Sequence, residues 1–111
     1  MATFYKGDEV KFAIELTAQG FSMDDDNFDI EVSSPKASVK ASKSTPAPEN
    51  ALVIFKDNEE ESATWYAIVA TSKLNPGDLR VIATAYVPDT EGPDGVRRQS
   101  DIKTLGTLKS K

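Results

Sequence analysis

The residues with the most evident chemistry are two runs of carboxylates. One run is Asp24-Asp25-Asp26, followed by Asn27, and the other is Glu59-Glu60-Glu61. Calcium prefers several oxygen ligands from one loop, but the spaced ligands, central glycine and distal glutamate of an EF-hand loop are missing. Because adjacent side chains point in different directions, we expect a solvated loop at Asp24 to Asp26, with calcium binding there as the alternative. The three glutamates are interpreted as a solvated turn.

Catalysis has few candidate groups in this chain, since histidine and cysteine are both absent. Thiol nucleophiles, Ser-His-Asp triads and zinc sites built on Cys and His are therefore excluded. A carboxylate pair is sufficient for glycoside hydrolysis, but the acidic residues fall in loops and on polar strand faces, without a cleft that would shift a pKa. We predict no enzymatic activity, no catalytic residue, no cofactor and no bound metal, and keep a carboxylate hydrolase as a third hypothesis.

The elements that would position these residues are predicted to be β-strands. Apolar and polar residues alternate along several segments, and no window shows the 3.6-residue period of a long amphipathic helix. Lysines at 36, 40 and 43 suit a protected edge strand at 37–41. The predicted strands outside the centre of the chain are 9–17, 28–32, 37–41, 51–55 and 96–104, the last of them followed by a basic tail, 105–111.

Two apolar runs lie at the centre of the chain, in 63–87. They are joined by Asn75-Pro76-Gly77-Asp78, which has the composition of a tight turn, so we predict a central β-hairpin. Trp65 and Tyr66 are neighbours on the first run and must face opposite ways. We expect Trp65 to pack between two sheets. For Tyr66 and Tyr86 we also expect packing in the core or at its flank, and the alternative is an aromatic surface offered to a sugar or a protein.

Together these segments predict an all-β fold, a single immunoglobulin-like antiparallel β-sandwich of about seven strands spanning residues 1–111. The chain has 111 residues, of which 39% are hydrophobic, enough for one core without metals or disulfides. A net charge of −5 argues against nucleic-acid binding, which needs clustered basic residues. No apolar run approaches the length of a membrane helix, and the N-terminus carries no export-signal pattern.

Three short pieces carry a resemblance to a known family. They are the opening Phe4-Tyr5-Lys6-Gly7-Asp8, the turn Asn75-Pro76-Gly77-Asp78-Leu79, and the late loop from Pro88-Asp89 to Asp94-Gly95-Val96-Arg97. With these pieces the chain resembles small immunoglobulin-like structural proteins of Bacteroidetes phages and prophages, including crAss-like phages. It is more distantly similar to the N-terminal modules of phage upper-baseplate proteins, although it lacks a fused receptor-binding or trimerising segment.

The resemblance implies a non-enzymatic virion component, such as a capsid decoration, head-fibre, tail or baseplate accessory protein. Such a protein is assembled in the bacterial host cytoplasm, resides in the virion and contacts other virion proteins in many copies. The strand at 96–104 and the Phe4-Tyr5 arm suit extension of a neighbour's sheet. A carbohydrate-binding module using Tyr66 and Tyr86 is the alternative. The candidate partner-contact residues are Phe4, Tyr5, Tyr66, Tyr86, Arg97 and Arg98.

Overall fold

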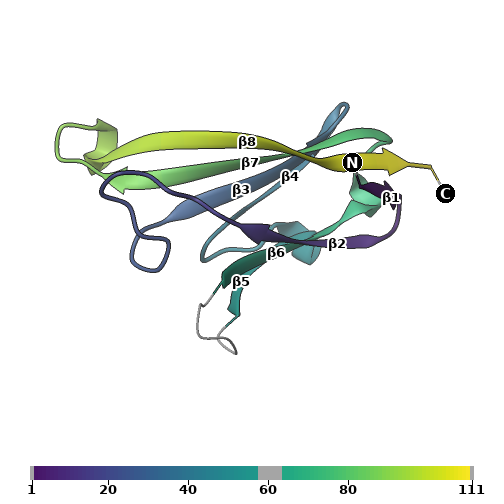
Figure 1. The fold of residues 1–111 in the computed structure, drawn as a ribbon, viewed down its shortest axis with the longest axis horizontal. Coiled ribbons are helices and arrows are strands. Elements are labelled where there is room, and N and C mark those ends of the chain that lie inside the picture. Colours follow the sequence, from purple (N-terminus) through teal and green to yellow (C-terminus); the bar gives the residue numbers. More distant parts are fainter. Residues whose placement is uncertain (1, 58–63, 111) are drawn as a thin grey trace.

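The fold is a β-sandwich, as the computed structural model shows for residues 2–57 and 64–110. Five strands form one sheet in the order β1-β8-β7-β3-β4, and three form the other in the order β2-β6-β5 (Figure 1). The predicted all-β sandwich is confirmed. The strands are β1 (Thr3–Tyr5), β2 (Glu9–Ile14), β3 (Phe28–Ser34), β4 (Ala37–Ser42), β5 (Leu52–Asp57), β6 (Thr64–Ala70), β7 (Gly77–Pro88) and β8 (Val96–Lys109).

Within the described residues, three single 3-10 turns lie between strands: η1 (Pro48–Asn50), η2 (Thr71–Lys73) and η3 (Pro93–Gly95). No helix in the described ranges is long and apolar enough to cross a membrane.

The core lies between the inner faces of the two sheets, where alternate residues of each strand point. Phe28, Ile30 and Val32 of β3 are completely buried, as is Val69 of β6. On β7 the buried side chains fall at alternate positions, as the strand period of two requires. The apolar alternation that predicted these strands is therefore the pattern that builds the core.

The predicted central hairpin is wrong. The two apolar runs became β6 and β7, but β6 pairs with β2 and β5, whereas β7 pairs with β3 and β8. The connection between them carries two fully buried side chains, Thr71 and Leu74, which anchor it inside the sandwich. It therefore crosses from one sheet to the other, and the turn composition of Asn75-Pro76-Gly77-Asp78 marks a change of sheet.

Both ends of the chain differ from expectation. Residues 105–109 were predicted as a tail, but they continue β8, and Leu108 is buried in the core. β1 pairs in parallel with this segment, with Thr3 opposite Thr107 and Tyr5 opposite Lys109. The structure thus has eight strands among the described residues, one more than expected, and one parallel pair in a sheet predicted to be antiparallel. The N- and C-terminal ends lie side by side (Figure 1).

Candidate functional site

An aromatic cluster covers the outer face of the three-stranded sheet. The rings of Phe55 and Tyr66 stack with their centroids 6.0 Å apart, and the ammonium group of Lys11 lies 4.6 Å from the centre of the Tyr66 ring. Val53 and Ile68 are opposite one another in the adjacent row of the same face. All four apolar side chains are partly exposed. A sheet face in contact with water alone usually carries polar residues, so this face is suited to binding another surface.

A polar network crosses the outer face of the five-stranded sheet. The hydroxyl of Tyr86 donates a hydrogen bond to Asp29, whose side chain is buried, and Lys40 lies 3.7 Å from the same carboxylate oxygen. The guanidinium of Arg98 lies 5.2 Å from the centre of the Tyr86 ring. The hydrogen bond to Asp29, and secondly burial, raise the pKa of Tyr86 above its ordinary value of 10.0. The network joins β8, β7, β3 and β4.

The acidic loop is held by lysines. Lys43 donates hydrogen bonds of 2.6 and 3.0 Å to the backbone carbonyls of Asp24 and Asp26, and Lys56 lies 2.8 Å from the Asp24 carboxylate. The bond from Lys56, followed by that from the Trp65 indole, lowers the pKa of Asp24 below its ordinary value of 3.8. Ammonium groups thus occupy positions at which a cation would bind. Among residues 2–57 and 64–110, no group of three or more acidic side chains could hold a metal ion.

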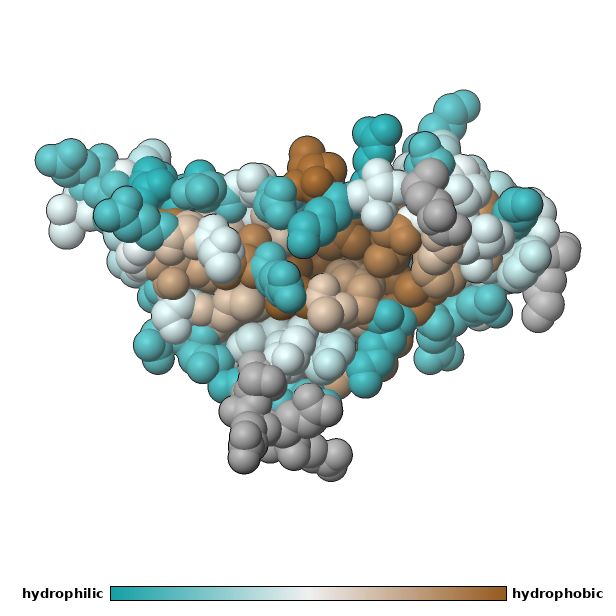
Figure 2. Space-filling view, in the orientation of Figure 1, coloured by the Kyte–Doolittle hydropathy of each residue, from teal (hydrophilic) through white to brown (hydrophobic). Residues whose placement is uncertain are grey.

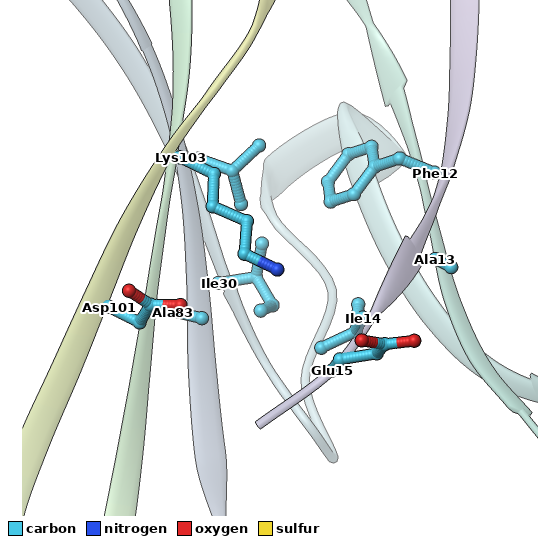
Figure 3. A pocket seen from close by; sticks show the side chains of 9 residues that line it. Phe12, Ala13, Ile14, Glu15, Ile30, Ala83, Asp101 and Lys103 are labelled. Carbon is cyan, nitrogen blue, oxygen red and sulfur yellow. The ribbon is translucent and has the colours of Figure 1, made fainter. Parts of the chain in front are cut away.

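A groove lies between β8 of the five-stranded sheet and β2 of the three-stranded sheet. Its floor is apolar and includes Phe12, Ile14 and Ile30, and apolar surface is visible in the hollow between the two strands (Figure 2). Lys103 extends from β8 into this gap toward Ile30 (Figure 3). The enclosed part has a volume of about 30 Å³, which accommodates a water molecule or two. Beyond Glu15 and Asp101 the groove continues into a wider hollow of about 250 Å³, lined by residues 15–18, Ala85 and 99–101.

The predicted contact residues are distributed over the whole molecule. Tyr66 and Tyr86 lie on the outer faces of different sheets, so they do not form one aromatic surface. Phe4 packs against the core, whereas Tyr5 remains 47% exposed. Arg97 bonds to Asp89 and Gln99 near the start of β8, and Arg98 belongs to the Tyr86 network. Trp65 faces the core as expected, but it is only partly buried, at the rim beside Phe28.

Sequence reasoning missed the partners of these residues. The continuous apolar run 51–55 predicts a strand but not which face Phe55 takes; the separation of three residues from the buried Leu52 places Phe55 on the outer face. Asp29 was expected on a polar strand face, and nothing local indicated that Tyr86 would cover it. Lys43 was interpreted as edge protection. The glutamates at 59–61 lie outside the described residues.

Comparisons with protein families, with curated proteins and with solved structures found no match to this chain.

Proposed function

We propose that this chain is a non-enzymatic structural protein of a bacteriophage virion, a capsid decoration, head-fibre, tail or baseplate accessory subunit. It acts through contacts with other virion proteins. The observation that supports this role best is the partly exposed aromatic cluster on the outer face of the three-stranded sheet. Phe55 and Tyr66 are aromatic residues of the kind enriched in protein interfaces, and they lie on rigid strands rather than on loops.

The strand order supports the immunoglobulin-like part of the proposal. A three-stranded sheet, β2-β6-β5, faces a sheet that contains β8-β7-β3-β4. This order resembles that of a variable-type immunoglobulin sandwich in which the first strand is short, as β1 is. Small domains of this kind offer two sheet faces and two edges for contacts, which suits a subunit present in many copies.

Co-sedimentation tests the proposal. Purified protein is mixed with virions of the phage or prophage that encodes it, prepared without this subunit, and the pellet is measured for bound copies per particle. We expect saturable binding at a fixed stoichiometry. A protein that remains monomeric and sediments with no particle would contradict the virion role.

Variants then test the surface. Replacing Phe55 and Tyr66 together by Ser is expected to abolish co-sedimentation while the circular dichroism spectrum is retained. Tyr5→Ser tests the other candidate contact surface separately, because it removes an exposed aromatic ring from β1, which belongs to the other sheet. Loss of co-sedimentation in Tyr5→Ser, with full binding in the double variant, would assign binding to β1 and away from the aromatic cluster.

Carbohydrate binding is the second candidate, and the stacked pair of Phe55 and Tyr66 is the observation that favours it. Flat, partly exposed rings can pack against the apolar face of a sugar. Saturable binding on a glycan array that is lost in Tyr66→Ala would support this function over the virion role. Tyr86→Ala is expected to leave any such binding intact, because Tyr86 lies on the other sheet.

A further inference from the structure

One edge of β8 is open over most of its length. β7 pairs with β8 on one side, while on the other side β1 reaches only Thr107, Leu108 and Lys109. No strand in residues 2–57 or 64–110 pairs with this outer edge from residue 96 to 105. Residues 97–104 are all exposed. A row of available N–H and C=O groups is a template for pairing with another strand.

The open edge carries a self-complementary pattern centred on Ile102. This side chain is 62% exposed, and it lies between Asp101 and Lys103, which carry opposite charges. If a second copy pairs antiparallel about this residue, Ile102 lies opposite Ile102 of the second copy. Asp101 of each copy then lies opposite Lys103 of the other, and Ser100 lies opposite Thr104. Apolar and oppositely charged cross-strand pairs both stabilise a sheet.

Other registers are less favourable. Centring the pair on Ser100 places Arg97 opposite Lys103, and centring it on Asp101 places two carboxylates opposite one another, both like-charge contacts. Centring on Gln99 pairs Arg97 with Asp101, but Arg97 already bonds to Asp89 at 3.4 Å. Lys103 by contrast has no ion pair within the described part of the chain, and its ammonium group projects into the groove (Figure 3). The pattern therefore favours the register centred on Ile102.

β1 limits the length of this contact. It occupies the edge at Thr107, and Leu105 has no partner on β7 because the register shifts between Leu79 and Arg80. A second copy can therefore pair only along about residues 99–105, fewer than 10 residues on each chain. The buried area is consequently below that of a stable obligate dimer, and we expect association in the micromolar range.

We propose that β8 joins two copies of this chain about a two-fold axis through Ile102, so that the two five-stranded sheets become one continuous sheet. Each copy uses the same surface, which closes the assembly at two subunits. The charge within the paired segment, residues 99–105, fits this role, since its one acidic residue, Asp101, and its one basic residue, Lys103, cancel. The pairing brings that acidic residue to a base of the other copy. The proposal does not depend on the virion role, because it concerns the isolated protein.

Sedimentation velocity on the purified full chain, over about 1 to 500 μM, tests the proposal. A monomer–dimer equilibrium is expected for the wild-type chain. Asp101→Lys and Lys103→Asp each create two like-charge pairs across the axis, so each variant is expected to dimerise at least about tenfold more weakly. An equimolar mixture of these two variants is expected to recover dimerisation, because the heterodimer again has only opposite charges facing one another.

Arg97→Asp is the matched control, since it changes the net charge as Lys103→Asp does but lies outside the paired segment. Circular dichroism and thermal unfolding confirm that all variants fold. A wild-type chain that is monomeric at the highest concentration overturns the proposal. Loss of dimer in Arg97→Asp equal to that in Lys103→Asp would overturn it too, as would a mixture that fails to associate.

Discussion

The indole Nε1 of Trp65 donates a hydrogen bond of 3.0 Å to Oδ1 of Asp24, 41 residues earlier in the chain. Lys56, on the strand paired with that of Trp65, lies 2.8 Å from the same oxygen. One carboxylate in the loop before β3 thus bonds to two strands of the other sheet. The acidic loop is therefore a link between the two sheets at the rim of the core.

This link predicts an acid-sensitive contribution to stability. The pKa of Asp24 is lowered by Lys56 and then by Trp65, so the contribution is fully present above its ordinary value of 3.8. It is lost as the pH falls through the lowered pKa of the folded state. Urea unfolding followed by Trp65 fluorescence, between about pH 2 and pH 7, is expected to show this loss in the wild type and not in Asp24→Asn. The neighbouring Asp25→Asn is the control and should lose stability at acidic pH as the wild type does. If the unfolding free energy of Asp24→Asn depends on pH as that of the wild type does, the link is contradicted.

Tyr86→Phe is expected to destabilise the fold by about 1 to 3 kcal/mol, because Asp29 loses a hydrogen-bond donor in a buried position. Thermal or urea unfolding at neutral pH measures this change. Lys40→Ala is the comparison. It removes the ion pair between an exposed lysine and the same carboxylate, and it should lower the free energy of unfolding by less. Equal costs in the two variants would show that the tyrosine hydroxyl has no special role.

The same tyrosine predicts behaviour at alkaline pH. Because its pKa is raised above 10.0 in the folded state, the stabilising contact is complete below that value and is lost as the pH rises through the raised pKa. Ultraviolet absorbance of tyrosinate, recorded for the wild type and for Tyr86→Phe, isolates this group by difference. We expect the difference curve to have its midpoint above pH 10.0. A midpoint below that value contradicts the hydrogen bond.

Thr71→Val tests the anchor of the connection between the sheets. The buried Thr71 hydroxyl accepts a 3.0 Å hydrogen bond from the Gly7 N–H and donates one of 2.7 Å to the Asp8 carbonyl. Valine keeps the shape but leaves these groups without their partner, so a cost of about 1 to 3 kcal/mol is expected. Thr71→Ser retains the hydroxyl and should preserve slow amide exchange at Gly7. If serine and valine accelerate that exchange equally, the hydroxyl is not the anchor.

Gly106→Ala is expected to detach β1. A Cβ atom at this position would lie 2.5 Å from the Ala2 carbonyl oxygen and 2.8 Å from a ring carbon of Phe4. The resulting overlap should lower the free energy of unfolding by about 1 to 3 kcal/mol. Hydrogen exchange should accelerate at the amides of Lys6 and Thr107, which bond β1 to β8, while the β7–β8 amides remain protected. Thr104→Ala, an exposed change on the same strand, is the control and should leave all these amides unchanged.

Local pattern predicted the strands but not their partners. The alternation around Val10 and Ile14, or around Phe28 and Ile30, requires only the preceding and following residues, and both strands formed. β2 nevertheless ends at Ile14, three residues before the predicted end at residue 17. Whether β6 pairs with β7 depends instead on where Thr71 and Leu74 are buried, which is a property of the whole sandwich. The continuation of β8 to Lys109 was missed for the same reason, since it depends on β1 from the opposite end of the sequence.

The candidate surfaces show the same difference between what a local pattern predicts and what depends on contacts between distant residues. Aromatic residues such as Tyr66 and Tyr86 could be selected from composition, but their assignment to different sheets could not. The Tyr86 bond to Asp29 spans 57 residues, and the Trp65 bond to Asp24 spans 41. Contacts at such separations leave no periodic signal in a single sequence.

The parallel pairing of β1 with the end of β8 has a mechanical consequence. Force applied between residues 2 and 110 draws the two strands in opposite directions along their own axes. The bonds from Thr107 to Ala2 and from Lys6 to Lys109 are then loaded together in shear instead of being opened one after another. Single-molecule stretching should therefore meet its first resistance at this clamp, and Gly106→Ala should lower the rupture force. An unchanged force would place the resistance elsewhere in the sandwich.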